Sequence, residues 1–230
     1  GYIYGLSVLS NFLSIPGMRK GLLLCGDKST QSTNYHDKST YPLFGDAGTA
    51  TLLQRNEQAK SMYFNLQSDG SGEEAIIIRG GATRHPSDEN TYVLKEVSPG
   101  ISRCQRDLEL DGVEVFNFSL REVKPNIVDL LAFSSTELED IDYLVMHQAN
   151  KLMNESVRKK LKFPVDKTPY SLEKFGNTSS ASIPLTIVTE LKDKLHGEKQ
   201  LLLSGFGVGF SWGSVLMSTN SPHVCDLIEI

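Results

Sequence analysis

The sequence predicts an α/β fold, because helical and strand patterns alternate along its second half. A long helix is expected at about 115–133, a short apolar strand at 143–146, and a further helix at about 151–161. The half closes with two strands, at 200–204 and 213–217, on either side of a glycine-rich loop. Helices and strands that alternate in this way are typical of layered domains.

The first half gives weaker patterns. A helix is expected at the start of this half, and no capping side chain precedes it. Its apolar residues recur at spacings of three or four: Ile3, Leu6, Leu9 and Leu13. The apolar run 21–25 predicts a buried parallel strand. The small residues of 44–50 allow the backbone to approach a neighbour closely and lead into a strand at 49–53. Residues 69–100 are expected to form an elaborated surface segment around a short strand at 75–78.

The last predicted helix follows a turn rich in Gly, Asn and Ser at 176–182. Pro184 falls in its first turn, where proline is tolerated, and Gly197 stops it after about residue 195. Both ends of this helix are therefore marked in the sequence.

Composition and charge narrow the function classes. The net charge of -5 argues against non-specific nucleic-acid binding, which needs a clustered basic surface. No apolar run approaches the roughly 20 residues that cross a membrane, and no signal peptide is evident, so we expect a cytoplasmic protein. The three cysteines, Cys25, Cys104 and Cys225, lack CxxC spacing and predict reduced thiols without a metal cluster.

Two polar residues are candidates for chemistry. His147 stands at the C-terminal end of an apolar strand, where open α/β sheets place groups that contact ligands. Its alternative role is a histidine satisfied by a neighbouring backbone carbonyl. Asn177 precedes a helix, where its carboxamide is able to donate to a substrate oxygen or to serve only as a turn residue.

The glycine-rich loop 205–213 lacks the spacing of a dinucleotide-binding loop, and a strand follows it. Its backbone N–H groups suit an oxyanion hole, although a tight hairpin would also need these glycines. Basic residues gather at the end of the helix after His147: Arg158, Lys159, Lys160 and Lys162. This cluster is either a solvated helix end or a contact for an acidic carrier protein or a phosphate.

Three motifs in this order and spacing give the chain a family resemblance: HQAN at 147–150, GNTSSASIP at 176–184 and GFGVGFSWG at 205–213. FGDAGTATLL at 44–53 and GVEVFNF from Gly112 add to them. The chain resembles beta-ketoacyl-acyl-carrier-protein synthase III. The resemblance implies a thiolase-like fold of duplicated α/β halves in α/β/α/β/α layers, and a homodimer. Residues 1–111 would be the incomplete N-terminal half with a surface insertion, and residues 112–230 the complete C-terminal half.

The resemblance also implies a catalytic triad of cysteine, histidine and asparagine, with His147 and Asn177 as its last two members. The cysteine is expected two residues before Gly1, so we expect the chain alone to be inactive. Val208 would supply a backbone donor to the oxyanion hole, at a position where the family commonly has glycine. Contacts to the carrier protein or coenzyme A are expected from four residues: Lys151, Arg158, Lys159 and Lys160. Leu152 stands where the family often has an arginine.

The implied activity is decarboxylative condensation of a short acyl-coenzyme A with malonyl-acyl-carrier protein, which initiates fatty-acid synthesis. Coenzyme A thioester is a substrate here, and no permanently bound cofactor or metal is expected. Two alternatives remain at this point. One is a related acyltransferase or condensing enzyme of specialised metabolism, and the other is a non-catalytic thiolase-fold binding protein.

Overall fold

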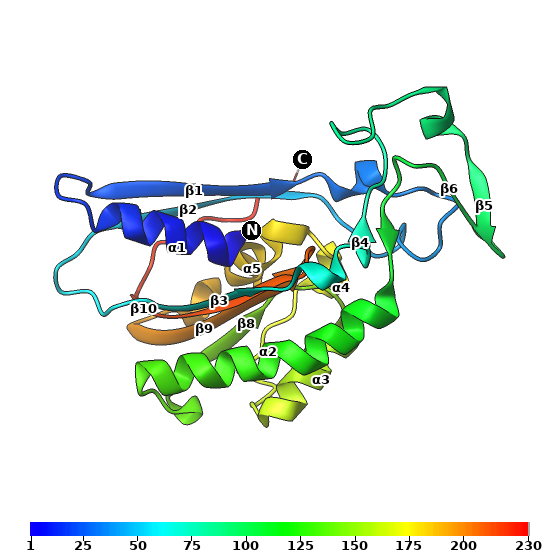
Figure 1. Cartoon of the computed structure of the whole chain (residues 1–230). Coiled ribbons are helices and arrows are strands. Elements are labelled where there is room, and N and C mark those ends of the chain that lie inside the picture. The colour runs from blue at the N-terminus through cyan, green and yellow to red at the C-terminus, as the bar shows by residue number, and fades with distance from the viewer. Residues whose placement is uncertain (230) are drawn as a thin grey trace.

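The computed structural model describes residues 1–229, which stack in four layers (Figure 1). The outermost layer is a ribbon of β1 (Lys20–Asp27) and β2 (Ala47–Gln54). Beneath it lie α1 (Tyr2–Leu13) and α5 (Ser182–Thr186), then a four-stranded sheet, and finally α2 (Gly112–Ser134) and α3 (Lys151–Leu161). Helices thus cover both faces of the central sheet, as the predicted α/β class requires.

The central sheet has the strand order β3-β10-β9-β8. Its strands have these bounds: β3 (Tyr63–Ser68), β8 (Tyr143–Met146), β9 (Glu198–Gly207) and β10 (Ser211–Asn220). β8 pairs with β9 in parallel, and the other pairs are antiparallel. Met146 lies opposite Ser204, and the N–H of His147 continues the ladder to the Ser204 carbonyl at 2.8 Å. His147 therefore leaves the sheet beside the glycine-rich loop.

The helices on one face confirm the sequence prediction most closely. α3 begins and ends at the predicted residues, because Asn150 caps its N-terminus and Lys162 ends it in the left-handed region at φ 59°. Asp111 caps α2 by accepting the N–H groups of Val113 and Glu114. Between these helices and the sheet, the Phe118 ring stacks on Phe210 with centroids 4.1 Å apart.

The helix after Pro184 reaches residue 194, close to the predicted end, but its hydrogen-bond pattern changes along the way. α5 is followed by a π-helical turn, Ile187–Leu191, and by a 3-10 turn, Lys192–Lys194. Leu191 and Leu195 are buried and belong to the core between this helix and the sheet. The predicted helix is thus confirmed in extent.

The prediction of a buried parallel strand at 21–25 is wrong. Among residues 1–229, β1 pairs with β2 alone, and the pair is antiparallel in a two-stranded sheet. One face of this ribbon packs on α1, whereas Leu22, Leu24 and Leu52 point outward and are 57–69% exposed. A continuous apolar run indicates that both faces are apolar, but it does not specify the partner strand or its direction.

The segment between β3 and α2 forms small hairpins, which project to one side of the molecule (Figure 1). Its strands have these bounds: β4 (Ile76–Ile77), β5 (Lys95–Ser98), β6 (Ile101–Arg103) and β7 (Glu109–Leu110). The strand predicted at 75–78 is therefore only two residues long. Short helices complete the fold: Ser29–Ser32, Gly70–Gly72, Glu89–Tyr92, Leu138–Asp140, Ser179–Ala181 and α4 (Leu172–Phe175).

The division at residues 111 and 112 stays a prediction. β3 precedes this boundary and pairs with β10, which follows it, so the central sheet draws on both segments. Among residues 1–229, no helix combines the length and the apolar character that crossing a membrane would require.

Candidate active site

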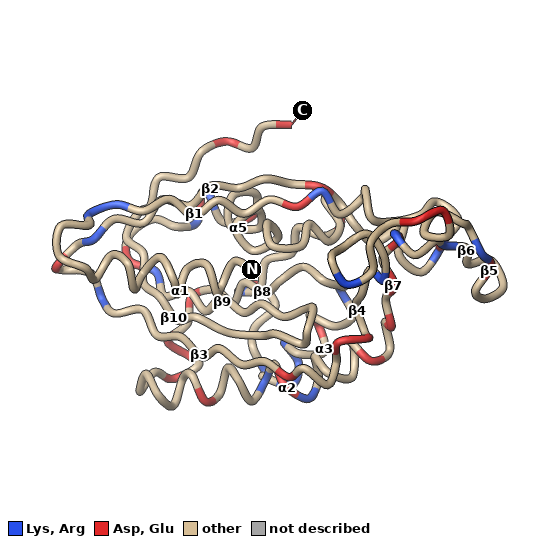
Figure 2. Tube along the Cα trace, turned by 45° about the horizontal axis from the view of Figure 1, so that its top comes forward, with Lys and Arg blue, Asp and Glu red and all other residues tan. Residues whose placement is uncertain are grey.

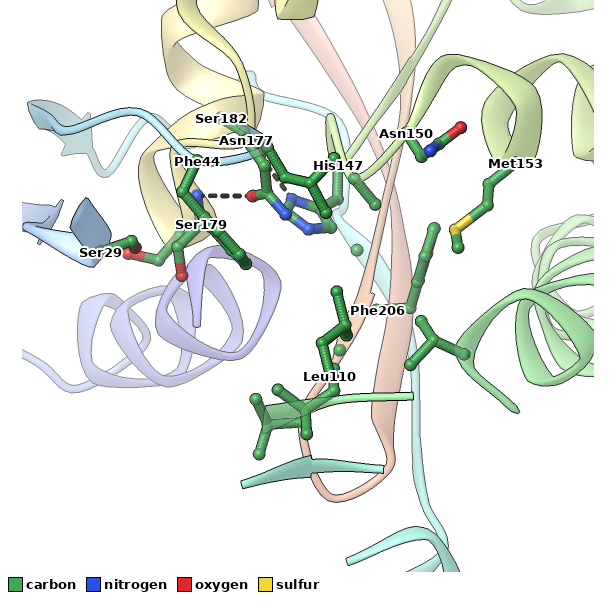
Figure 3. Close-up of a pocket in the computed structure, with 18 of the residues that line it drawn as sticks. Ser29, Phe44, Leu110, His147, Asn150, Met153, Asn177, Ser179, Ser182 and Phe206 are labelled. Carbon is green, nitrogen blue, oxygen red and sulfur yellow. Dashed lines mark hydrogen bonds between the residues drawn. The ribbon is translucent and has the colours of Figure 1, made fainter. Parts of the chain in front are cut away.

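A cavity of about 890 Å³ opens where β8 and β9 end. Its wall includes His147 and Asn177, together with Gly1 at the start of α1 and Val208 in the glycine-rich loop. Figure 3 shows side chains that line it, from both ends of the chain. Most of the remaining wall is apolar, and includes Ile76, Leu110, Val115, Phe116, Met153 and Phe206. The cavity therefore joins a few polar groups to an apolar enclosure, the usual form of a small-molecule site.

Several contacts hold His147 in place. Nδ1 of its ring lies 2.6 Å from the hydroxyl of Ser182, and the ring meets Phe206 edge to face at 5.6 Å. Asn154, which is fully buried, donates to the His147 carbonyl at 3.0 Å. The next residue, Gln148, is buried and links the Met146 carbonyl to the N–H of Ser171. The motif around His147 thus fixes the backbone as well as the imidazole.

The imidazole is neutral at physiological pH. Burial lowers the pKa of His147 from 6.5 to about 4. The Ser179 carbonyl and the Asp27 carboxylate oppose this shift more weakly. A neutral imidazole donates from only one ring nitrogen, so the position of that proton decides what the ring offers a ligand.

Asn177 has its carboxamide oriented by the following turn. Its Oδ1 accepts the N–H of Ser179 at 2.9 Å, which leaves the Nδ2 donors for the cavity (Figure 3). Its backbone is held as well, because its N–H donates to the Leu43 carbonyl at 2.8 Å. The Asn177 carbonyl accepts the N–H of Gly45 at 3.0 Å. These bonds belong to an isolated parallel β-bridge between Phe44 and Asn177. The FGDAG segment therefore fixes the position of the Asn177 backbone.

This bridge explains the small residues predicted to allow close backbone approach at 44–50. A Cβ on Gly45 would lie 2.0 Å from the Phe175 carbonyl oxygen. Gly176 has φ 65°, and a Cβ there would lie 2.9 Å from the Leu43 carbonyl oxygen. Two backbones meet at this point with no room for side chains.

The glycine-rich loop connects β9 to β10, as predicted for a strand, loop and strand. Val208 lies in this turn, lines the cavity and is 63% exposed. Its assignment as an oxyanion-hole donor stays a prediction. Gly205 lets α1 approach the sheet, since a Cβ on it would lie 3.2 Å from Ile3.

The basic residues of α3 differ in whether they already form ion pairs or hydrogen bonds within the chain. Arg158 forms a double contact with Glu155 and donates to the Phe163 carbonyl. Lys151 pairs with Glu173, and Lys160 donates to the Leu120 carbonyl at 3.0 Å. Lys159 is exposed and has no ion-pair partner within residues 1–229. Figure 2 shows basic segments interspersed with acidic ones on the α2 and α3 side of the molecule.

Sequence reasoning placed His147 and Asn177 but missed Ser182 and Asp27. Asp27 ends β1 and accepts the N–H of Ser180 at 2.9 Å, so it holds the turn that follows Asn177. The signal for Ser182 was its place in the same motif as Asn177. None of the three cysteines lines the cavity, and among residues 1–229 no cluster of His, Cys, Asp and Glu is suited to hold a metal ion.

Comparison with known proteins places this geometry in a family. The family model of 3-oxoacyl-[acyl-carrier-protein] synthase III matches residues 1–70, and the model of the C-terminal region of the same family matches residues 131–219. The beta-ketoacyl-[acyl-carrier-protein] synthase III of Streptococcus agalactiae is 32% identical over 220 residues, which cover 94% of this chain and 64% of that protein. The chain thus spans slightly less than two thirds of this relative.

Solved structures agree with these matches. The crystal structure of 3-oxoacyl-(acyl-carrier protein) synthase from Burkholderia xenovorans is 33% identical, with a TM-score of 0.89, and the match covers all of this chain and 64% of the other. A 3-oxoacyl-(acyl-carrier-protein) synthase III structure at 2.1 Å is 35% identical with the same TM-score, and covers 94% of this chain and 65% of the other.

The stacked layers and these likenesses define a protein of the thiolase-like fold class. Within that class, the chain belongs to the 3-oxoacyl-[acyl-carrier-protein] synthase III family.

Proposed function

We propose that the full-length protein condenses a short acyl-coenzyme A with malonyl-acyl-carrier protein, releasing carbon dioxide, and so initiates fatty-acid synthesis. The observation that carries this proposal is the convergence of His147 and Asn177 on one apolar cavity, at the N-terminus of α1. Both side chains are oriented by the fold before any ligand enters, and preorganised donors of this kind stabilise developing negative charge.

The first stage of the proposed reaction needs a cysteine thiolate. We propose that it stands two residues before Gly1, because Gly1 lines the cavity and the N-terminus of α1 begins there. A helix N-terminus lowers the pKa of a thiol and so favours the thiolate. The thiolate attacks the acyl-coenzyme A carbonyl and the acyl group moves to the cysteine sulfur, while the carbon–sulfur bond to coenzyme A breaks and coenzyme A leaves as a thiolate that takes up a proton from water.

The second stage is decarboxylation and condensation. His147 and Asn177 donate hydrogen bonds to the thioester oxygen of the malonyl group as the loss of carbon dioxide builds enolate charge there. The resulting carbanion attacks the acyl-cysteine carbonyl, whose oxygen the Val208 N–H holds. This attack forms the new carbon–carbon bond, and collapse of the tetrahedral intermediate restores the carbonyl, breaks the carbon–sulfur bond and expels the cysteine thiolate.

Carrier recognition is assigned to the basic residues of α3: Lys151, Arg158, Lys159 and Lys160. Lys159 is the most available of these cations, since Arg158 and Lys151 already pair with Glu155 and Glu173. An exposed cation attracts an acidic carrier mainly by raising the rate of encounter. The full-length protein is proposed to act as a homodimer without a permanently bound cofactor.

The test separates the two stages in the full-length protein. Incubation with acetyl-coenzyme A should raise the intact mass by one acetyl group, and mutation of a cysteine two positions before Gly1 should abolish the increase. His147→Ala and Asn177→Ala should slow malonyl-carrier decarboxylation by at least about a hundredfold, while self-acylation falls much less. An unmodified wild-type protein, or equal loss of both stages in the variants, would overturn the proposal.

A further inference from the structure

The hydroxyl of Ser182 is within hydrogen-bond distance of two groups around the proposed catalytic imidazole. Its oxygen lies 2.6 Å from Nδ1 of His147 (Figure 3) and 3.3 Å from the backbone nitrogen of Gln148. Ser182 is 1% exposed, so water does not compete for these contacts. A backbone N–H only donates, which means that the contact with Gln148 uses a lone pair of the serine oxygen.

The serine oxygen has two lone pairs and one hydrogen, so the direction of the shorter bond depends on where that hydrogen points. Within residues 1–229, Nδ1 of His147 is the one acceptor within hydrogen-bond distance of the hydroxyl, and a buried hydroxyl that only accepted would leave its hydrogen unpaired. A neutral imidazole that accepts at Nδ1 carries its proton on Nε2. In the competing arrangement, Nδ1–H donates to Ser182, and Nε2 is left as an acceptor.

We propose that Ser182 is a positioning residue that donates to Nδ1 of His147 and thereby keeps the His147 proton on Nε2. The tautomer does not depend on the proposed function, but its role in catalysis rests on it. In the proposed reaction, the enolate oxygen needs Nε2–H as a hydrogen-bond donor, and the lone pair of an unprotonated Nε2 would repel that oxygen. The placement of Ser182 suits the role, because α5 begins at this residue and the sheet holds His147.

The decisive measurement is the tautomer of His147 in the full-length protein labelled with ¹⁵N-histidine. The chain has five histidines, and the signal that disappears in His147→Gln identifies His147. We expect a protonated, pyrrole-type Nε2 and an unprotonated, pyridine-type Nδ1 at pH 7. A protonated Nδ1 in the wild-type protein would overturn the inference.

Variants test whether Ser182 is the cause. Ser182→Ala should populate the Nδ1–H tautomer and lower kcat for malonyl-carrier decarboxylation on the order of tenfold, with little change in KM. Ser182→Thr keeps the hydroxyl and should restore Nε2–H. Thr189→Ala is the matched control, because its hydroxyl donates to the Leu185 carbonyl and it lies outside the cavity wall. An unchanged tautomer in a folded Ser182→Ala protein would contradict the assignment.

The spectrum and the enzyme assay report on different claims. If the wild-type protein showed Nε2–H but failed to decarboxylate malonyl-carrier protein, the proposed function would be wrong and the tautomer assignment would stand. If it decarboxylated normally with Nδ1 protonated, the inference about Ser182 would be wrong and the function would stand. The wild-type tautomer is informative even if Ser182→Ala fails to fold.

Discussion

The carboxylate of Asp27 accepts the backbone N–H of Ser180 at 2.9 Å, and so joins residues 153 positions apart. The hydroxyl of Ser180 donates to the same oxygen. This contact ties the end of β1 to the turn between Asn177 and Ser182. A side chain at the edge of the outer ribbon thereby helps to set the geometry of the cavity.

Asp27→Ala should reduce the free energy of unfolding by about 2 kcal/mol at pH 7, because it leaves the Ser180 N–H without its partner. Burial alone would raise the pKa of Asp27, but the bonds from Ser180 outweigh it, and the net pKa lies below 3.8. The stabilisation is therefore complete above pH 4 and fades as pH falls through the lower folded value. Urea unfolding of both proteins at pH 7 and pH 3 checks this, and a difference that grows in acid would contradict it.

Gly45→Ala should destabilise the protein by about 2–3 kcal/mol and displace Asn177, because the new Cβ collides with the Phe175 carbonyl. Gly48→Ala is a matched control three residues later, where a Cβ meets nothing within 4 Å. Thermal unfolding measures the first effect, and the decarboxylation rate measures the second. Similar behaviour of the two variants would show that the close approach at Gly45 is unimportant.

How far the sequence predicted these features depends on the range of the interaction. The bounds of α3 follow from local signals, the cap at Asn150 and the run of periodic residues, and they were predicted correctly. The antiparallel pairing of β1 with β2 was not predicted, because an apolar run does not indicate the direction of the neighbouring strand. Similarly, His147 was found from its place at a strand end, whereas its contact with Ser182 depends on how two distant elements rotate against each other.

The low pKa of His147 makes stability depend on pH in a definite direction. Between pH 6.5 and about 4 the unfolded chain binds a proton at this residue and the folded protein does not, so stability falls as pH falls through that range. From pH 7 to pH 5 the wild type should lose about 2 kcal/mol more than His147→Gln. Urea unfolding at both values measures this, with the exposed His196→Gln as control. Equal losses in all three proteins would rule out a buried neutral His147.

Charge reversal at Lys159 tests the carrier surface. Lys159→Glu should raise KM for malonyl-carrier protein several-fold at low salt, because an acidic carrier would meet a like charge. The effect should shrink at high ionic strength, and acylation by acetyl-coenzyme A should not change. Lys194→Glu makes the same charge change on the helical layer across the central sheet. Equal effects of the two variants would indicate a general charge effect instead of a docking contact.

The parallel pairing of β8 with β9 also bears on the order in which the protein folds. It joins Leu144 to Leu202, 58 positions further along the chain, and α3 and the Asn177 turn lie within that loop. Contacts this distant in sequence form slowly, since the chain entropy of closing the loop is lost before the pairing contributes any stability. His147 leaves the sheet at the end of this pair, so its place beside Ser182 follows from completed strand pairing. A partly folded chain would accordingly contain helices before it contained a site.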